Sequence, residues 1–264
     1  MRKLSAVLVV ILVLVAVAAT GEPMMLVTGY VPGQVEEAYA YTHGGYVGRA
    51  VVRVQSDGSL DVDIDEAFLP HTLGIVDIES AEWTDENTAY YIQRGSEVRV
   101  AKYIEYDGTV YVGTTVGGAM IYVEADENGM PAGSQDLEQQ ILRNQSTMAA
   151  YYNGIQSGSF KIYTRFGGRA MTVSTTSYGG VTKNNSPGYW AFGQTWQGNI
   201  DAIEEFIEEN GSDYSASDMV RASEENADGL RLWSVADAVT GATNSDFKDY
   251  FAVAQLAIAQ LKTR

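Results

Sequence analysis

The chain has 264 residues, 45% of them hydrophobic and 11% aromatic, which is enough to form a folded core in one large or two small domains. Its formal net charge of −17 disfavours nucleic-acid binding, because the phosphate backbone would be repelled. The sequence contains no cysteine, which excludes disulfides, thiolate metal sites and a lipid-modified N-terminal cysteine. With 27 Gly and 5 Pro, the composition favours turns between short strands over a helical bundle.

Residues 1–21 predict export. Two basic residues precede an apolar run over residues 4–19, which ends in the small residues 16–18. This is the pattern of a signal peptide cleaved near Ala18 or Gly21. Because the run is only slightly shorter than a membrane-spanning helix, an uncleaved membrane anchor is the alternative. In both cases we expect the rest of the chain to lie in the periplasm or at the outer face of the cytoplasmic membrane.

Alternating apolar and polar residues predict β-hairpins in the first half of the chain. Residues 45–68 alternate on both sides of a central turn. Residues 89–114 contain aromatic and β-branched stretches separated by turns, and a further strand is expected at residues 118–126. The predicted turns are residues 56–59, 94–96 and 107–108.

Helical periodicity appears in the second half of the chain. One helix is expected from Ser134 to Gly158, and another at residues 199–211, with isoleucines on one side and solvated acidic residues on the other. A short helix at residues 218–225 and a final helix from Phe247 follow, while residues 160–178 predict a hairpin. Strand pairs and helices in this irregular order predict an α+β fold with a mainly antiparallel sheet and packed helices.

A boundary between two subdomains is expected only in the turn region at residues 128–134. It separates a β-rich N-terminal part, residues 28–127, from a part that contains all the predicted helices, residues 134–264. One continuous domain is the alternative. The sequence has no repeat of fixed period and no low-complexity linker that would mark another boundary.

Acidic residues alternate along the predicted strand at Asp61, Asp63 and Asp65, where carboxylates on one face would suit Ca²⁺. Because Glu66 occupies the position at which a calcium loop needs glycine, a solvated strand face is the favoured interpretation and no metal is predicted. The two histidines have no zinc spacing, and His43 is assigned to a turn. P-loop and G-x-G-x-x-G fingerprints are also absent from the sequence.

The segment DAVTGATNS, residues 237–245, precedes the final helix and has two interpretations. In the simpler one, Thr243 and Asp246 form a capping box and the Gly-Ala pair allows a tight turn. In the other, the free N–H groups and the positive dipole end of the helix favour a phosphate, which the threonine hydroxyl carries. The small residues then leave room for a phosphate donor, and Asp237 orients the hydroxyl or assists a metal-bound donor.

This segment resembles the D-x-x-[S/T]-G-A-T-x-[S/T] motif of FMN-binding domains. These occur in a flavin-carrying subunit of the sodium-pumping NADH:quinone oxidoreductase, in Rnf-type electron-transport complexes and in exported bacterial flavoproteins. In that family a Mg²⁺-dependent flavin transferase uses FAD to join FMN, through a phosphoester, to the threonine of G-A-T. The resemblance therefore implies covalent FMN on Thr243. The other matching positions are Asp237, Thr240, Gly241, Ala242 and Ser245.

Two further stretches are similar to the same family. Residues 44–68 resemble the glycine-x-tyrosine strand pair that often opens such domains, and residues 184–211 resemble a segment of its exported members. Two departures occur: threonine replaces the more usual serine at Thr240, and the lipobox cysteine of lipid-anchored relatives is missing. The first keeps a hydroxyl at this position, and the second leaves membrane attachment open.

Aromatic side chains supply the apolar, partly stacked site that an isoalloxazine ring needs. Tyr189, Trp190 and Trp196 lie in a glycine-rich stretch, and we expect them to contact the flavin. Trp233 is close in sequence to the motif. Packing in the core is the alternative for each of these residues, because large aromatic side chains usually serve that role.

The signal and the motif together predict an exported electron-transfer flavoprotein with covalent FMN. Its expected partners are a flavin transferase and a membrane redox partner or other electron carrier. It is expected to be an electron carrier, or the flavin subunit of an extracytoplasmic reductase, because the redox chemistry belongs to the cofactor. One alternative is a protein that binds or scavenges flavin without a covalent bond. Another is a structural surface protein in which TGAT is only a helix cap.

Overall fold

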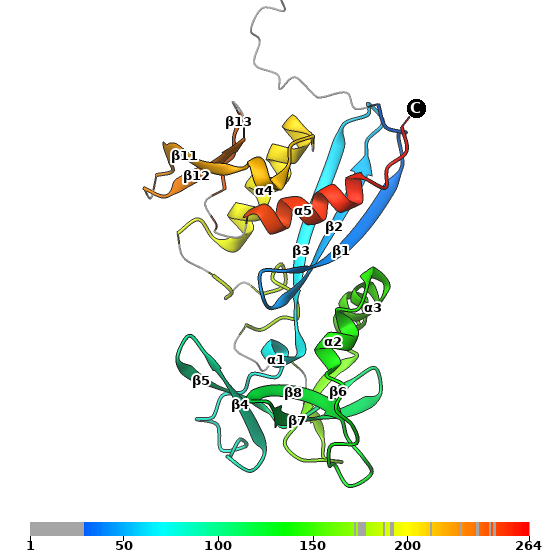
Figure 1. The fold of residues 1–264 in the computed structure, drawn as a ribbon, viewed down its shortest axis with the longest axis vertical. Helices are drawn as coiled ribbons and strands as arrows, with labels where there is room; N and C mark the ends of the chain where they lie inside the picture. The colour runs from blue at the N-terminus through cyan, green and yellow to red at the C-terminus, as the bar shows by residue number, and fades with distance from the viewer. Residues whose placement is uncertain are drawn as a thin grey trace, which may run out of the picture.

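The computed structural model describes residues 29–263 except 172, 174–177, 187, 191–192, 212, 228, 236–237, 243 and 245–246. The predicted signal peptide therefore lies outside the described residues. Every strand pair within them is antiparallel, and helices pack against the sheets (Figure 1), so the expected α+β fold with mainly antiparallel sheets is confirmed. In the described part of the chain, no helix combines the length and the apolar character needed to cross a membrane.

The elements follow one another along the chain in an irregular order of strands and helices. The strands are β1 (Val35–Thr42), β2 (Tyr46–Val54), β3 (Leu60–Phe68), β4 (Thr88–Gln93), β5 (Ser96–Ala101), β6 (Tyr103–Tyr106), β7 (Thr109–Val116), β8 (Ala119–Glu124), β9 (Phe160–Tyr163), β10 (Ala170–Met171), β11 (Val220–Glu225), β12 (Arg231–Val235) and β13 (Ala238–Val239). The helices are α1 (Pro70–Leu73), α2 (Leu137–Ile141), α3 (Gln145–Gln156), α4 (Trp196–Asn210) and α5 (Phe247–Ile258), with a 3-10 turn at Ala216–Asp218.

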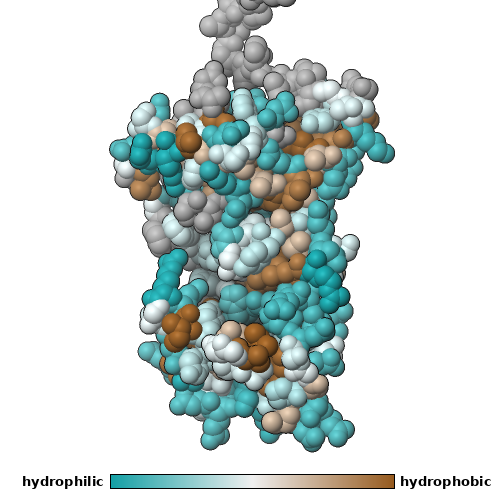
Figure 2. Space-filling view, viewed as in Figure 1, coloured by the Kyte–Doolittle hydropathy of each residue, from teal (hydrophilic) through white to brown (hydrophobic). Residues whose placement is uncertain are grey.

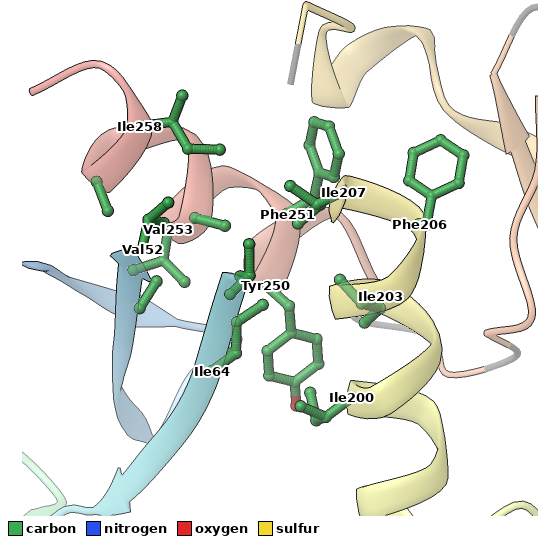
Figure 3. Packing of buried hydrophobic residues seen from close by; sticks show 14 of the residues in the cluster. Val52, Ile64, Ile200, Ile203, Phe206, Ile207, Tyr250, Phe251, Val253 and Ile258 are labelled. Atoms are coloured by element: carbon green, nitrogen blue, oxygen red, sulfur yellow. The ribbon is translucent and has the colours of Figure 1, made fainter. Parts of the chain in front are cut away.

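A long three-stranded sheet, β1-β2-β3, lies beside α4 and α5 in the upper half of the view in Figure 1. The hairpin expected at residues 45–68 is confirmed as β2 and β3, which pair from Tyr46 opposite Phe68 to Val54 opposite Leu60. One face of the sheet packs against α4 and α5. Figure 3 shows this core, in which Ile64 of β3 lies near Ile203 of α4 and Phe251 of α5, all 0% exposed. We call it the α4/α5 core.

A second core forms around the sheet β10-β9-β6-β7-β8, the hairpin β4-β5 and helices α1 to α3. Helix α3 also packs on β1, where the rings of Tyr39 and Tyr152 lie 5.7 Å apart between their centroids. Both cores combine residues from the two sides of the turn at 128–134. The subdomain boundary expected at that turn stays a prediction. On the face seen in Figure 2, hydrophilic side chains predominate, with a smaller apolar group over α5.

The strands and turns expected at residues 89–126 are confirmed as β4 to β8. The hairpin expected at residues 160–178 is confirmed only in its pairing of β9 with β10, because β10 covers just Ala170–Met171 and Val173 lies in a 3-10 turn. Helix α4 begins at Trp196, three residues before the expected start, because the Thr195 side chain accepts a hydrogen bond from the Gly198 N–H and caps it. The final helix is confirmed as α5.

The single helix expected from Ser134 to Gly158 is wrong, because the chain forms two helices, α2 and α3. Asn144 interrupts them in an extended conformation and caps α3: its side chain accepts from the Thr147 N–H at 3.0 Å. The Asn144 N–H in turn donates to the Thr147 hydroxyl at 3.1 Å. The apolar periodicity continues across the break, and this side-chain competition for backbone groups is what ends the first helix.

The short helix expected at residues 218–225 is also wrong, because strand β11 occupies Val220–Glu225. Its backbone pairs with β12, with Val220 opposite Ser234 and Arg221 opposite Trp233. The segment has several residues with good helix propensity, and its strand conformation depends on pairing with β12. Tertiary pairing overrides local propensity here.

Two acidic residues of α4 bind the outer edge of β3 and are not simply solvated, as the sequence had indicated. The Glu204 carboxyl group accepts from the Ile64 N–H at 2.6 Å, and the Glu208 carboxyl group accepts from the Val62 N–H at 2.8 Å. These N–H groups lie on the edge of β3 away from β2. The helix therefore supplies side-chain acceptors where an additional strand would supply carbonyl groups.

Glu204→Gln is expected to make stability less dependent on pH. Burial, followed by the nearby acids Asp63, Asp201 and Glu208, raises the pKa of Glu204 from 4.5 to about 8. Because its pKa is higher in the folded than in the unfolded protein, Glu204 favours folding when it is protonated. This contribution to stability is complete below about pH 4.5 and is lost as the pH rises through about 8. Between pH 5 and pH 9, the free energy of unfolding of wild type should therefore fall by on the order of 2 kcal/mol more than that of the variant, after allowance for solvent screening.

Urea unfolding of both proteins at pH 5 and pH 9 measures this difference. Glu205→Gln, on an exposed position of the same helix, is the matched control and should follow wild type at both pH values. An equal change in the free energy of unfolding for wild type and Glu204→Gln would contradict the prediction.

Candidate functional site

A small pocket lies where α4, α5 and the segment before α4 meet. The three aromatic residues expected to contact a flavin, Tyr189, Trp190 and Trp196, all line it. Asn244, which follows Thr243 in the sequence, lines it as well. The remaining lining residues are Lys183, Asn199 and Tyr250. The fold thus brings the aromatic stretch and Asn244 of the segment 237–245 to one site.

The three aromatic residues have different environments within this pocket. Trp196, the first residue of α4, is only 6% exposed, and its indole N–H donates to the Tyr250 hydroxyl at 3.2 Å. The Tyr189 hydroxyl lies 3.0 Å from that of Tyr46. Trp190 is 48% exposed and has a φ of 49°, a left-handed conformation that is strained for a bulky residue. Trp196 therefore also serves the core, whereas Trp190 presents its side chain to solvent.

The described residues of the motif form a tight turn against α4. The Thr240 hydroxyl accepts from the Ala242 N–H at 3.1 Å and is buried, so it acts as a turn-forming group. At Gly241 a Cβ atom would lie 3.0 Å from the Cβ of Ala202, closer than ordinary contact, and only glycine allows this approach without adjustment. Asp237, Thr243 and Ser245 lie outside the described residues, as does the capping box expected from Thr243 and Asp246.

Asn244 is fixed at the pocket by its backbone. Its N–H donates to the Asn199 side chain at 2.9 Å, and its carbonyl accepts from the Trp233 indole N–H at 2.7 Å. The nitrogen and oxygen of its side-chain amide are buried and have no hydrogen-bond partner among the residues that the structure describes. A buried amide in this state costs about 1–3 kcal/mol, which a ligand with a complementary polar edge can offset.

A buried ion pair lies beside the pocket. The Lys183 ammonium contacts the Glu66 carboxylate, and the two side chains are 1% and 0% exposed. Glu66 also accepts from the Thr42 hydroxyl and, at 2.9 Å, from the Tyr250 hydroxyl. Lys183 lines the pocket and Glu66 does not, so the positive end of the pair faces it.

Aromatic rings surround the Lys183 ammonium. Its nitrogen lies 3.8 Å from the ring centroid of Tyr46, 4.7 Å from that of Tyr189 and 5.6 Å from that of Trp196. The ring faces attract the cation and shield it from water. Burial raises the pKa of Tyr46 and of Tyr250 well above the ordinary tyrosine value, so both hydroxyls stay neutral.

His43 connects this cluster with the surface. It lies in the turn between β1 and β2, as expected, and its Nε2 atom is 3.3 Å from the Lys183 ammonium and 3.4 Å from the Glu66 carboxylate. The backbone N–H of His43 donates to the Asp249 carboxylate at 3.0 Å. Because Asp249 is 47% exposed, the polar cluster extends from the pocket wall to solvent.

Asp65 is buried, at 4% exposure, and the interpretation of a solvated face is wrong for this residue. It accepts from the Tyr152 hydroxyl at 2.6 Å and from the Asn184 N–H at 3.1 Å, and so holds the segment with Lys183 against β3. Burial raises the pKa of Asp65. The partly exposed Asp61 and Asp63 face arginines, and among the described residues no group of acids and histidines is arranged to hold a metal ion.

Sequence reasoning did not identify Lys183 or Glu66 as site residues. Lys183 stands in a polar stretch with no motif of its own, and Glu66 follows a run of alternating acids that resembles an exposed strand face. Their pairing depends on an antiparallel bridge between Ala67 and Thr182. No local pattern signals a contact between segments so far apart in the chain.

Comparison with known proteins gives no relative for this chain. No family model matches it, and no curated protein or solved structure is significantly similar to it. The resemblance to FMN-binding domains therefore depends on residues 44–68, 184–211 and 237–245 alone.

Proposed function

We propose that the protein is an exported electron-transfer flavoprotein that carries FMN on Thr243. The observation that supports this most directly is the composition of one pocket, which Tyr189, Trp190 and Trp196 share with Asn244, the neighbour of Thr243. The resemblance assigns the motif to flavin attachment, and the aromatic residues suit an isoalloxazine ring. Asn244 is more than 45 positions from each of these aromatic residues, and they meet only in the fold.

The donor set of the pocket fits a flavin. The side-chain amide of Asn244, which has no hydrogen-bond partner among the described residues, offers one acceptor and one donor group to the polar edge of a flat ring, and the aromatic residues offer apolar faces. The space open to water-sized molecules is about 30 Å³, far below the roughly 300–1,000 Å³ typical of ligand pockets. The ring would therefore be only partly enclosed, with the exposed Trp190 beside it.

Attachment follows the chemistry of phosphoryl transfer. The Thr243 hydroxyl oxygen forms a bond to the FMN phosphorus of FAD, the bond from that phosphorus to the bridging oxygen breaks, and AMP leaves with the proton of the hydroxyl. A flavin transferase with Mg²⁺ catalyses this step, and the present chain supplies only the acceptor. When attached, FMN would supply one- and two-electron redox chemistry, and the residues of the pocket would hold and orient it.

In the proposed role the protein receives electrons from a membrane redox partner or another electron carrier and passes them to an acceptor outside the cytoplasm. It works as a carrier, or as the flavin subunit of a reductase, in the periplasm or at the outer face of the cytoplasmic membrane. The N-terminal segment supplies membrane attachment if it is not cleaved.

The test is an intact mass and a peptide map of the exported protein, co-expressed with a flavin transferase. A single FMN adduct on the peptide that contains Thr243 is the expected result, and the same chain expressed without the transferase is the control. Flavin that is released on denaturation, with no adduct, would support non-covalent binding instead. A colourless protein with an unmodified Thr243 in the presence of active transferase would contradict both.

A further inference from the structure

The buried pair of Lys183 and Glu66 needs an explanation beyond stability. Burying two charges costs more than most pairs recover, and apolar residues of similar size often serve a core equally well or better. This pair is almost fully enclosed and is further held by the hydroxyls of Thr42 and Tyr250. The fold therefore fixes an ammonium group at one place in the pocket wall, with its counter-charge on the far side.

We propose that the Lys183–Glu66 pair tunes the flavin of this pocket by favouring its reduced, anionic form. The inference rests on the proposed function. Two electrons and one proton convert oxidised FMN to the anionic reduced form, so the ring gains one negative charge on reduction. A positive group at the pocket wall interacts more favourably with the charged ring than with the neutral one.

Lys183 is a positioning and tuning residue in this proposal. Glu66 lies behind it and partly cancels its charge, so the effect on the ring is that of a dipole whose positive end points toward the pocket. For a charge several ångströms away in a partly buried site, this corresponds to about a tenfold preference for reduced over oxidised flavin. For a two-electron couple, tenfold equals about 30 mV in midpoint potential.

The experiment compares flavin midpoint potentials of the full exported chain, flavinylated by a co-expressed transferase, in dithionite titrations against a reference dye. The double variant Lys183→Met with Glu66→Gln removes both charges together and leaves neither one buried alone. Its potential should fall by about 30 mV, a tenfold loss of preference for the reduced flavin. The matched control is Lys161→Met with Glu105→Gln, which removes another Lys–Glu pair, of 2.6 Å, away from the pocket and should leave the potential unchanged.

Equal or higher potential in the double variant than in wild type would overturn the role of the pair and leave the proposed function intact. A wild-type chain that takes up no flavin overturns both, and its mass reveals this before any potential is measured. If the double variant alone takes up no flavin, Glu66→Gln decides. It keeps the ammonium without its counter-charge, so a potential above wild type supports the proposal and an equal or lower one contradicts it.

Discussion

Thr243→Ala is expected to abolish the covalent FMN adduct completely. Alanine has no hydroxyl to form the phosphoester, so the transferase finds no acceptor at this position. The aromatic residues and Asn244 remain in the pocket, and any non-covalent affinity for FMN should survive. Intact mass reports the loss of the adduct, and flavin absorbance after denaturation and desalting separates bound from attached flavin.

Thr115→Ala is the matched control for this variant, because it removes a hydroxyl from an exposed position on β7. Its adduct should be retained in full. Full flavinylation of the Thr243→Ala protein, or an adduct mapped to another peptide of the wild type, would contradict attachment at Thr243.

Lys183→Met should destabilise the protein by about 3–5 kcal/mol, the usual cost of removing one partner from a buried ion pair. The Glu66 carboxylate would then stay buried without its ammonium partner, with the hydroxyls of Thr42 and Tyr250 as donors and the His43 ring 3.4 Å away. Adding Glu66→Gln should recover most of the loss, because glutamine is neutral and still accepts from the hydroxyls. Urea unfolding at neutral pH gives the free energies of all three proteins.

Lys161→Met provides the comparison, since Lys161 is 41% exposed and pairs with Glu105 in a more solvated place. It should cost no more than about 1 kcal/mol. The interpretation of Lys183 would be wrong if its replacement cost as little, or if the double variant were no more stable than Lys183→Met alone.

Local patterns predicted the parts of the fold that local forces determine. The hairpin at residues 45–68 has apolar–polar alternation and a tight glycine turn, and both features act within a few residues. The break at Asn144 was missed because apolar periodicity continues through it, and β11 was missed because its conformation depends on pairing with β12. Neither feature is encoded in the hydrophobic pattern of its own segment.

The candidate site likewise has a part that the sequence predicted and a part that it did not. Aromatic residues and the motif could be proposed as neighbours from their chemistry, and Tyr189, Trp190, Trp196 and Asn244 do line one pocket. The buried ion pair beside the pocket could not be predicted, because Lys183 and Glu66 are separated by 117 positions and are paired through the fold. Sequence reasoning identifies groups with recognisable chemistry, whereas burial gives ordinary charged residues their importance.

The carboxylates of α4 on the edge of β3 also affect how this protein meets other chains. An open strand edge is a template on which another chain can add a strand and begin an aggregate. Here Glu204 and Glu208 already accept from two of the edge N–H groups, so an incoming strand would have to displace them. Helix α4 therefore protects the sheet against intermolecular strand addition while its first turn forms part of the pocket.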